Sequence, residues 1–359
     1  MLERYGHGGD LRTAAETFGL EAGAFLDYSS NMNPFGPPEA VGTVFRERWA
    51  DIAKYPDPAV RELRERIAER YGIPPESVLA GNGAAELIDL AVRVLRPGVT
   101  ALARPSFAEY EEAVRKIGGR TVDIPLSAED GFELTERALA AAEGEAELLF
   151  LGHPNNPTGR LIPQHTLQRL IDSGRRLILD EAFIDFSPEE DEMSRICEAA
   201  ASRSLFVIRS MTKFFAIPGI RLGFIVAHPD WIGRMRELQV AWSVNSFAQW
   251  IGAVALSPAN EAYVRQTKSW LQQERPWLAG RLEALGITVY PSDTNFLLLR
   301  LPEPERLDVR QLQRRLGERG VLIRDASLFA GLDRSYVRIA VRLREQNERL
   351  LAELGNALA

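Results

Sequence analysis

Short apolar runs alternate with amphipathic stretches between residues 75 and 230. The runs predict buried strands at 99–105, 147–154, 175–183, 204–210 and 221–229. The stretches between them, such as 107–118 and 164–174, carry apolar residues at helical spacing. Strands without polar alternation, separated by helices, are typical of a mostly parallel sheet covered on both faces. We therefore expect an α/β fold whose ligand lies beyond the carboxyl ends of the strands.

The pattern changes after about residue 245. A long helical region is expected from Asn245 to about Leu285, followed by a strand-like segment, a helix, two strands and a final helix. This order predicts a small α+β domain. The turn-rich residues 1–40 are expected to form an arm and part of that domain. The predicted division is therefore 1–40, a large domain over 41–260, and a small domain over 261–359.

Composition narrows the class of protein. The 359 residues are 45% hydrophobic and 26% charged, with a net charge of −7. These values are typical of a soluble globular protein and argue against a nucleic-acid platform. No apolar run approaches the ~18 residues of a membrane span, and the first ten residues lack a signal-like region. We expect a cytoplasmic protein that binds neither nucleic acid nor membranes.

Three further expectations concern cysteine, histidine and acidic side chains. The single cysteine, Cys197, is expected in the core and excludes an internal disulfide. The four histidines show no metal-ligand spacing, so no metal site is predicted. The acidic run 188–192 is expected to be a solvated loop.

Lys213 is the first candidate for chemistry. The chain has four lysines beside 39 arginines, and only Lys213 precedes an apolar run, residues 214–217. A partly desolvated ammonium has a lowered pKa and gives a nucleophilic amine. The alternative is a lysine that extends from a core segment to solvent.

Three other motifs lie at predicted strand ends. Glycines 81 and 83 open an amphipathic helix, so the amides of Gly83, Ala84 and Ala85 can bind an anion. Asn156 follows a strand in a Pro-rich turn. Asp180 ends an apolar run, where a carboxylate requires a cationic partner.

Together these residues fit pyridoxal phosphate, which needs a lysine, an acid facing its ring nitrogen and a phosphate cup. Lys213 and Asp180 supply the first two. The cup would combine the Gly83 helix with Ser210, Thr212 and Arg221. Asn156 would donate to the ring oxygen, and Phe107 would stack on the ring.

The chain resembles the class I/II aminotransferase group of fold-type I pyridoxal-phosphate enzymes along essentially its whole length. The shared motifs are YPDP (55–58), GNG (81–83), NNPTG (155–159), DEAF (180–183), SMTK (210–213) and PGIRLGF (218–224). The resemblance implies an aspartate-aminotransferase-like fold. Softer matches, among them HGG (7–9) and WSVN (242–245), resemble a branch that decarboxylates a phosphorylated amino acid. A branch that transaminates a phosphorylated amine is the alternative, and a non-catalytic cofactor-binding regulator is a more distant one.

The resemblance also implies roles for residues outside the cofactor set. Tyr55 would reach the cofactor phosphate of a neighbouring subunit, which implies a homodimer with shared sites. Arg338 would bind the substrate carboxylate. The substrate side, with candidates for a second anion site, would include His7, Gly8, Asn31, Asn33, Pro34 and Arg324. Each role has a structural alternative. Tyr55 would then pack within the YPDP turn, Arg338 would be a charge on an edge strand, and Arg324 would form an ordinary salt bridge.

One position departs from the group. Most of its aminotransferases have tyrosine where this chain has Phe183, so a hydroxyl donor to the ring oxygen is absent. We expect this change to alter the acid–base behaviour of the lysine–cofactor linkage and to favour an outcome other than transamination.

Overall fold

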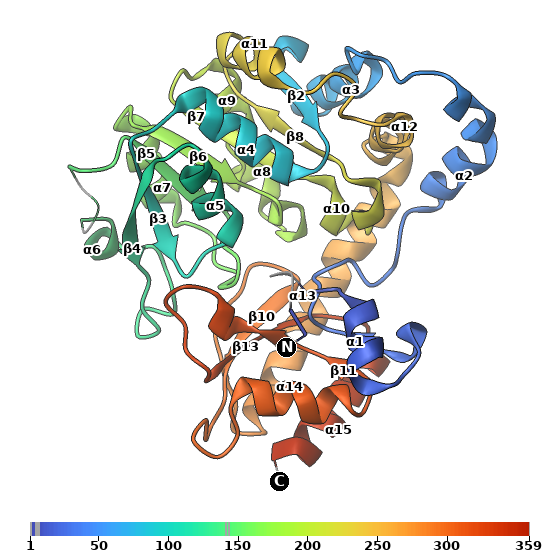
Figure 1. The fold of residues 1–359 in the computed structure, drawn as a ribbon, viewed down its shortest axis with the longest axis vertical. Helices are drawn as coiled ribbons and strands as arrows, with labels where there is room; N and C mark the ends of the chain where they lie inside the picture. Colours follow the sequence, from blue (N-terminus) through green and yellow to red (C-terminus); the bar gives the residue numbers. More distant parts are fainter. Residues whose placement is uncertain (1, 4–7, 141, 143, 359) are drawn as a thin grey trace.

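The computed structural model describes residues 2–3, 8–140, 142 and 144–358. Figure 1 shows two halves, each built around its own sheet, with α13 (Glu261–Glu283) running from one half into the other. The helix follows α12 (Ser246–Ala255) after a short break. The single helical region expected from Asn245 is therefore interrupted, with a 3-10 turn at Pro258–Asn260.

The large half contains a seven-stranded sheet in the order β2-β8-β7-β6-β5-β3-β4. Its strands are β2 (Val78–Gly81), β8 (Gly223–Val226), β7 (Leu205–Ser210), β6 (Arg176–Asp180), β5 (Leu148–Gly152), β3 (Val99–Arg104) and β4 (Arg120–Pro125). All neighbours pair in parallel except β8, which is antiparallel to both β2 and β7. The five predicted strands all form. β2 and β4 were not predicted, and β4 carries exposed polar residues that hide an apolar pattern.

Alternate residues of the central strands enter two separate cores. Leu177 and Leu179 of β6 pack into one core, and Ile178 packs into the other. Helices α4 (Ala84–Leu95), α5 (Ala108–Lys116) and α11 (Pro229–Leu238) contribute to the second core. Helices α7 (Gln164–Asp172) and α9 (Ile196–Ala201) contribute to the first. Burial on both faces explains why β5 reads as an unbroken apolar run, LLFLG.

The small half contains an antiparallel sheet in the order β12-β13-β10-β9. Its strands are β12 (Arg324–Asp325), β13 (Tyr336–Ala340), β10 (Phe296–Arg300) and β9 (Thr288–Val289). β1 (Leu26–Asp27) pairs in parallel with β11 (Val321–Leu322), so a segment near the start of the chain joins the half built mainly by its end. The remaining helices are α1 (Leu11–Phe18), α2 (Glu39–Arg48), α3 (Arg61–Tyr71), α6 (Glu136–Ala140), α8 (Glu190–Met193), α10 (Met211–Phe214), α14 (Val309–Gly317) and α15 (Arg344–Leu358).

Two expectations about single residues are wrong. Cys197 is exposed on α9, because that helix turns its apolar face, including Ile196 and Ala200, inward and leaves Cys197 on the other side. The acidic run 188–192 is a solvated loop only in part: residues 188 and 189 form an exposed turn, but α8 begins at Glu190, and Glu190 is buried. Its carboxylate pairs with Arg209 and Lys268, partners that lie 19 and 78 residues away.

Candidate active site

A cavity of about 710 Å³ lies at the carboxyl ends of β5, β6 and β7 and reaches the small sheet. Side chains from both halves line it. Fourteen of the residues proposed from the sequence are among them: Gly8, Asn31, Ala84, Ala85, Phe107, Asn156, Asp180, Phe183, Ser210, Thr212, Lys213, Arg221, Arg324 and Arg338. The topology therefore brings together residues that are hundreds of positions apart in the chain.

Lys213 lies on α10, the single helical turn that follows β7. Burial is the main cause that lowers the pKa of its amine, to about 8, and the nearby guanidinium groups of Arg338 and Arg221 act in the same direction. Asp180 opposes them. About a tenth of the Lys213 amine is therefore neutral and nucleophilic at pH 7, far more than for a lysine in water.

Asp180 is held at the end of β6 by two donors. The Tyr110 hydroxyl donates to Oδ2 at 2.7 Å, and the Ala182 amide donates to Oδ1 at 3.0 Å. Burial raises the pKa of the Asp180 carboxyl, and the two donors lower it. A buried carboxylate that still lines the cavity is suited to hold a positive charge on a bound ring. The Tyr110 ring stacks on Phe150 at 4.1 Å, which fixes the hydroxyl.

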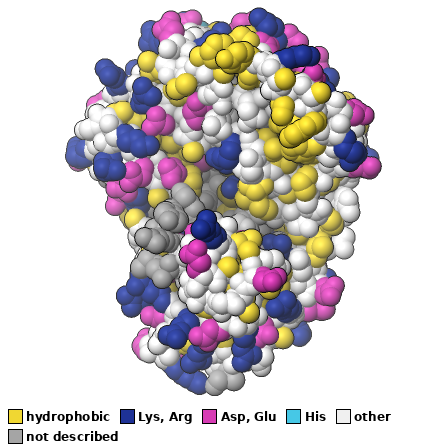
Figure 2. Space-filling view, turned by 45° about the vertical axis from the view of Figure 1, so that its right-hand side comes forward, with side chains coloured by type: hydrophobic (Ala, Val, Ile, Leu, Met, Phe, Trp, Pro, Cys, Tyr) yellow, Lys and Arg dark blue, Asp and Glu magenta, His cyan; other side chains and the backbone are white. Residues whose placement is uncertain are grey.

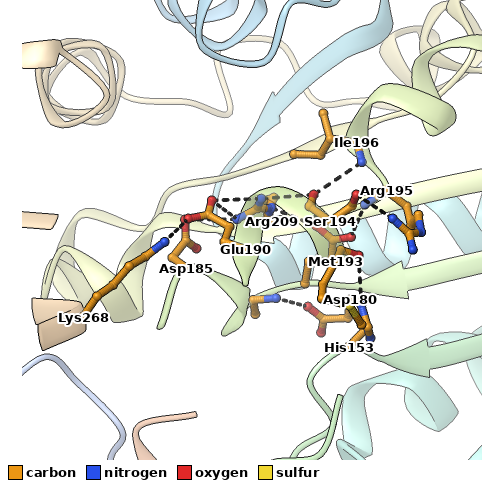
Figure 3. A network of polar contacts seen from close by, with 12 residues as sticks. His153, Asp180, Asp185, Glu190, Met193, Ser194, Arg195, Ile196, Arg209 and Lys268 are labelled. Atoms are coloured by element: carbon orange, nitrogen blue, oxygen red, sulfur yellow. Dashed lines mark hydrogen bonds and ion pairs between the residues drawn. The ribbon is translucent and has the colours of Figure 1, made fainter. Parts of the chain in front are cut away.

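Behind these strand ends lies a buried ionic cluster (Figure 3). Arg209, next to Ser210, pairs through Nε with Glu181 Oε2 at 3.0 Å, and Glu181 follows Asp180. Arg209 also pairs with Asp185 and Glu190. Successive residues of an extended chain point to opposite sides, so Arg209 and Glu181 point away from the side that Ser210 and Asp180 present to the cavity. The ion pair between them links the ends of β6 and β7.

The phosphate cup predicted at the start of α4, called the cradle below, is present in part. Ala84 and Ala85 line the cavity at the start of this twelve-residue helix, opposite the Ser210 and Thr212 hydroxyls, which lie 2.8 Å apart. Gly83 is the N-cap with φ of 80°, and a Cβ there would meet Arg221 Nη2 far inside van der Waals contact. Gly83 itself does not line the cavity. Because it has no side chain, Arg221 can lie across the start of the helix.

Arg338 crosses from the small sheet to the large one. Its Nη1 donates to Asn156 Oδ1 at 2.6 Å and its Nη2 to the Ser29 carbonyl at 2.7 Å. Its Nε has no hydrogen-bond partner among the described residues. The side chain is 6% exposed, and burial lowers the pKa of its guanidinium to about 9. A buried guanidinium with an available N–H is a suitable site for a carboxylate.

The remaining predicted residues lie in different surroundings. Arg324 is 5% exposed and lines the same cavity as Asn31, whose Oδ1 has no partner among the described residues. Asn33 does not line the cavity: its backbone amide donates to the Lys213 carbonyl, and its side chain bonds Phe214 and Thr267. Asn33 therefore positions the lysine turn.

Tyr55 lies away from the cavity lining and is 84% exposed. Its ring packs against Trp242 at 5.2 Å. His7 falls outside the described residues. Phe107 and Phe183 line the cavity, and the Phe183 ring meets Phe296 edge-on at 4.9 Å.

Sequence reasoning missed Tyr110 and Glu3, which also line the cavity. Tyr110 lies on the predicted helix 107–118 only three residues after Phe107, so one helical turn could have indicated a shared face. Glu3 offered no comparable signal, because its partners lie more than 300 residues away.

Comparison with known proteins identifies the family. Residues 24–354 match the model of the family described as aminotransferase class I and II, so the chain belongs to this family. The threonine-phosphate decarboxylase of Salmonella typhimurium is 40% identical over 98% of this chain and 96% of its own. The resemblance seen in the sequence motifs is therefore confirmed.

Solved structures agree with this assignment. The L-threonine-O-3-phosphate decarboxylase of Porphyromonas gingivalis aligns with a TM-score of 0.83 and 28% identity, covering 93% of this chain and 99% of its own. The histidinol-phosphate aminotransferase of Clostridium acetobutylicum gives 0.85 and 30%, with the same coverage. The expected aspartate-aminotransferase-like fold, with its mixed central sheet and small antiparallel sheet, is confirmed.

Enzymes of this family use pyridoxal phosphate, as predicted, and the cavity fits that cofactor. The cavity is lined by an amine with a lowered pKa and by a buried carboxylate. It is also lined by the start of a helix, two hydroxyl groups and an arginine. Lys213 would carry the cofactor and Asp180 would face its ring nitrogen. Ala84, Ala85, Ser210, Thr212 and Arg221 would hold its phosphate. These individual roles remain predictions.

Among the described residues, no helix is long and apolar enough to cross a membrane. The same residues contain no group of three or more His, Cys, Asp or Glu side chains placed to hold a metal ion.

Proposed function

We propose that the chain catalyses the decarboxylation of L-threonine O-3-phosphate to (R)-1-aminopropan-2-ol O-phosphate in cobalamin (adenosylcobalamin) biosynthesis. The observation that carries the proposal is the pair of buried arginines, Arg338 and Arg324, in the same cavity as Lys213. They give one site for a carboxylate and one for a phosphate. The 40% identity with the Salmonella typhimurium enzyme supports the same reaction.

Pyridoxal phosphate, when bound, accepts the electron pair left at the substrate α-carbon when one of its bonds breaks. The protein's residues decide which bond that is. Arg338, fixed by Asn156 and the Ser29 carbonyl, would hold the substrate carboxylate in one orientation. Asp180 would keep the ring nitrogen protonated. After carbon dioxide leaves, Lys213 Nζ, with a pKa of about 8, would return a proton to the α-carbon.

Specificity would come from the second anion site. Arg324 lies on β12, paired with Arg338 on β13 in the sheet register. Two adjacent buried guanidinium groups favour a ligand with two negative groups over one with a single carboxylate. Gly8 and Asn31 line the same cavity, and Asn31 Oδ1 has no hydrogen-bond partner in the described part of the chain.

We further propose a homodimer in which Tyr55 reaches the neighbouring subunit's cofactor. Figure 2 shows hydrophobic side chains gathered at upper right, the side on which Figure 1 draws α2 and α12. The exposed large apolar side chains include Trp49 (64%), which directly follows α2, Val240 (75%), and Tyr55 (84%) and Trp242 (51%), which pack together. Solvent exposure of several large apolar groups marks an interaction surface. Sedimentation equilibrium tests this, and Trp242→Glu is expected to shift the protein toward monomers with cofactor affinity reduced.

The predicted division into 1–40, 41–260 and 261–359, and a cytoplasmic location without nucleic-acid or membrane partners, belong to the same proposal. The pairing of β1 with β11 supports assigning part of the first segment to the small domain. The acidic balance, a net charge of −7, supports the absence of a nucleic-acid partner.

The test uses purified, cofactor-loaded protein and L-threonine O-3-phosphate without a keto acid, following carbon dioxide release and cofactor absorbance together. We expect steady release with the cofactor retained in its aldehyde oxidation state. Conversion to the amine form of the cofactor by histidinol phosphate, without carbon dioxide release, would instead establish a histidinol-phosphate aminotransferase. Inactivity with both substrates would favour a non-catalytic cofactor-binding protein.

A further inference from the structure

Glu3 lies in the wall of the cavity although it is almost at the start of the chain. It is 5% exposed. Its Oε1 accepts a hydrogen bond from Gln313 Nε2 of α14 at 2.8 Å and another from the Asp325 amide of β12 at 3.1 Å. Two donors from different elements therefore fix one oxygen of this carboxyl group.

The other oxygen, Oε2, has no hydrogen-bond partner among the described residues. Among the described residues, the cation paired with Glu3 is Arg324, whose Nη1 is 3.9 Å from Oε1. A direct guanidinium–carboxylate hydrogen bond is typically about 2.7–2.9 Å long. Glu3 is therefore poorly placed as a direct partner for Arg324, and the hydrogen-bonding capacity of its buried Oε2 is not used by any described residue.

The charges around Glu3 act in opposite directions. Burial raises the pKa of its carboxyl group, and the Asp325 carboxylate adds to the rise. The Arg324 guanidinium and the two hydrogen-bond donors lower it, with a net upward shift. Arg338 of β13 also interacts with the Glu3 charge. Protonation of Glu3 is thus easier than for a carboxyl group in water.

A phosphate bound beside Arg324 would place new negative charge close to the Glu3 carboxylate in a buried space. We propose that Glu3 takes up a proton from solvent when the substrate phosphate binds, and that its Oε2–H then donates a hydrogen bond to that phosphate. This inference rests on the proposed function, because it assigns the second anion site to the phosphate. It makes Glu3 a specificity-determining residue. The protonated form of Glu3 would donate a hydrogen bond to a phosphate, and the ionised form would repel one.

The experiment uses cofactor-loaded protein and 3-phosphooxybutanoate, the substrate skeleton without the amine that reacts with the cofactor. Calorimetry at about pH 7.5, in buffers with different ionisation enthalpies, gives the number of protons taken up on binding. The wild type is expected to take up close to one more proton than Glu3→Gln, which keeps an acceptor for Gln313 and a donor toward the ligand. As pH rises, the Kd of the wild type should increase relative to that of Glu3→Gln by up to about tenfold per pH unit.

Matched controls separate this effect from general charge removal. Glu16→Gln also removes a carboxylate near the start of the chain. The Glu16 side chain is at the surface, 67% exposed, and pairs with Arg12. It should behave as the wild type. Glu3→Asp keeps an ionisable group and should keep part of the extra proton uptake. 3-Hydroxybutanoate, which lacks the phosphate, should bind to all variants with equal proton uptake.

Equal proton uptake in the wild type and Glu3→Gln would overturn the inference, as would a failure of the wild type to bind 3-phosphooxybutanoate. Carbon dioxide release from L-threonine O-3-phosphate is measured on the same preparations. Release together with equal proton uptake refutes only the role of Glu3. Glu3-dependent proton uptake without release supports that role and refutes the proposed reaction.

Discussion

Tyr110→Phe removes one oxygen atom and tests how the site holds its buried acid. The Tyr110 hydroxyl donates to Asp180 Oδ2 at 2.7 Å, and its loss leaves the Ala182 amide as the donor to that carboxylate. A hydrogen bond to a charged group contributes about 1.5–3 kcal/mol. Since 1.36 kcal/mol corresponds to a factor of ten, we expect kcat/KM to fall by roughly 10- to 150-fold.

The pH profile gives the second readout. The hydroxyl stabilises the ionised form of Asp180, so its removal raises the pKa of a carboxyl group that burial has already raised. Activity that needs the carboxylate should then disappear at a higher pH as the solution is made more acidic. Tyr28→Phe, which removes a buried hydroxyl bonded to Asn347, is the control and should keep the wild-type profile. A change in kcat/KM below about threefold, with an unmoved acidic limb, would refute this account of Asp180.

Three further changes test other parts of the site. In cofactor-free protein, Lys213 should be acylated by an amine-reactive probe at a rate that levels off above about pH 8 and falls about tenfold per pH unit below it, because its pKa is lowered to about 8 and only the neutral amine reacts. Mass spectrometry measures the rate, and a rate that keeps rising about tenfold per pH unit to about pH 10, as for an ordinary lysine, would contradict it. Gly83→Ala should weaken cofactor binding at least about tenfold by displacing Arg221, whereas Gly118→Ala, which has a similar φ of 76° and open space, should not; equal cofactor Kd values would count against the cradle. Phe183→Tyr adds a hydroxyl and should raise the ratio of amino transfer to carbon dioxide release; an unchanged ratio, with unchanged cofactor titration, would remove Phe183 from the choice of reaction.

Local sequence patterns were sufficient for much of the fold and for choosing residues that the structure brings to one cavity. The apolar runs that end at Asp180 and at Ser210, three residues before Lys213, place both residues near strand ends, and parallel strands bring such ends to one edge. The same patterns failed for Glu190, which looked like part of a solvated run. Its burial depends on Arg209 and Lys268, two cations that no local window contains.

The sequence by itself determined the class of fold and the family, and it singled out Lys213 as the lysine predicted to carry the cofactor, because periodicity and short motifs act over a few residues. Only the tertiary structure decided which donors bind Asp180 and that Asn33 contacts the Lys213 turn instead of the cavity. It also decided that Glu3 lines the same cavity as Arg324. Each depends on contacts between distant segments: Tyr110 lies 70 residues from Asp180, and Glu3 lies 322 residues from Asp325. Such pairs are set by how the two sheets pack around the cavity, where burial lowers the pKa of Lys213 and raises the pKa of Asp180 and Glu3.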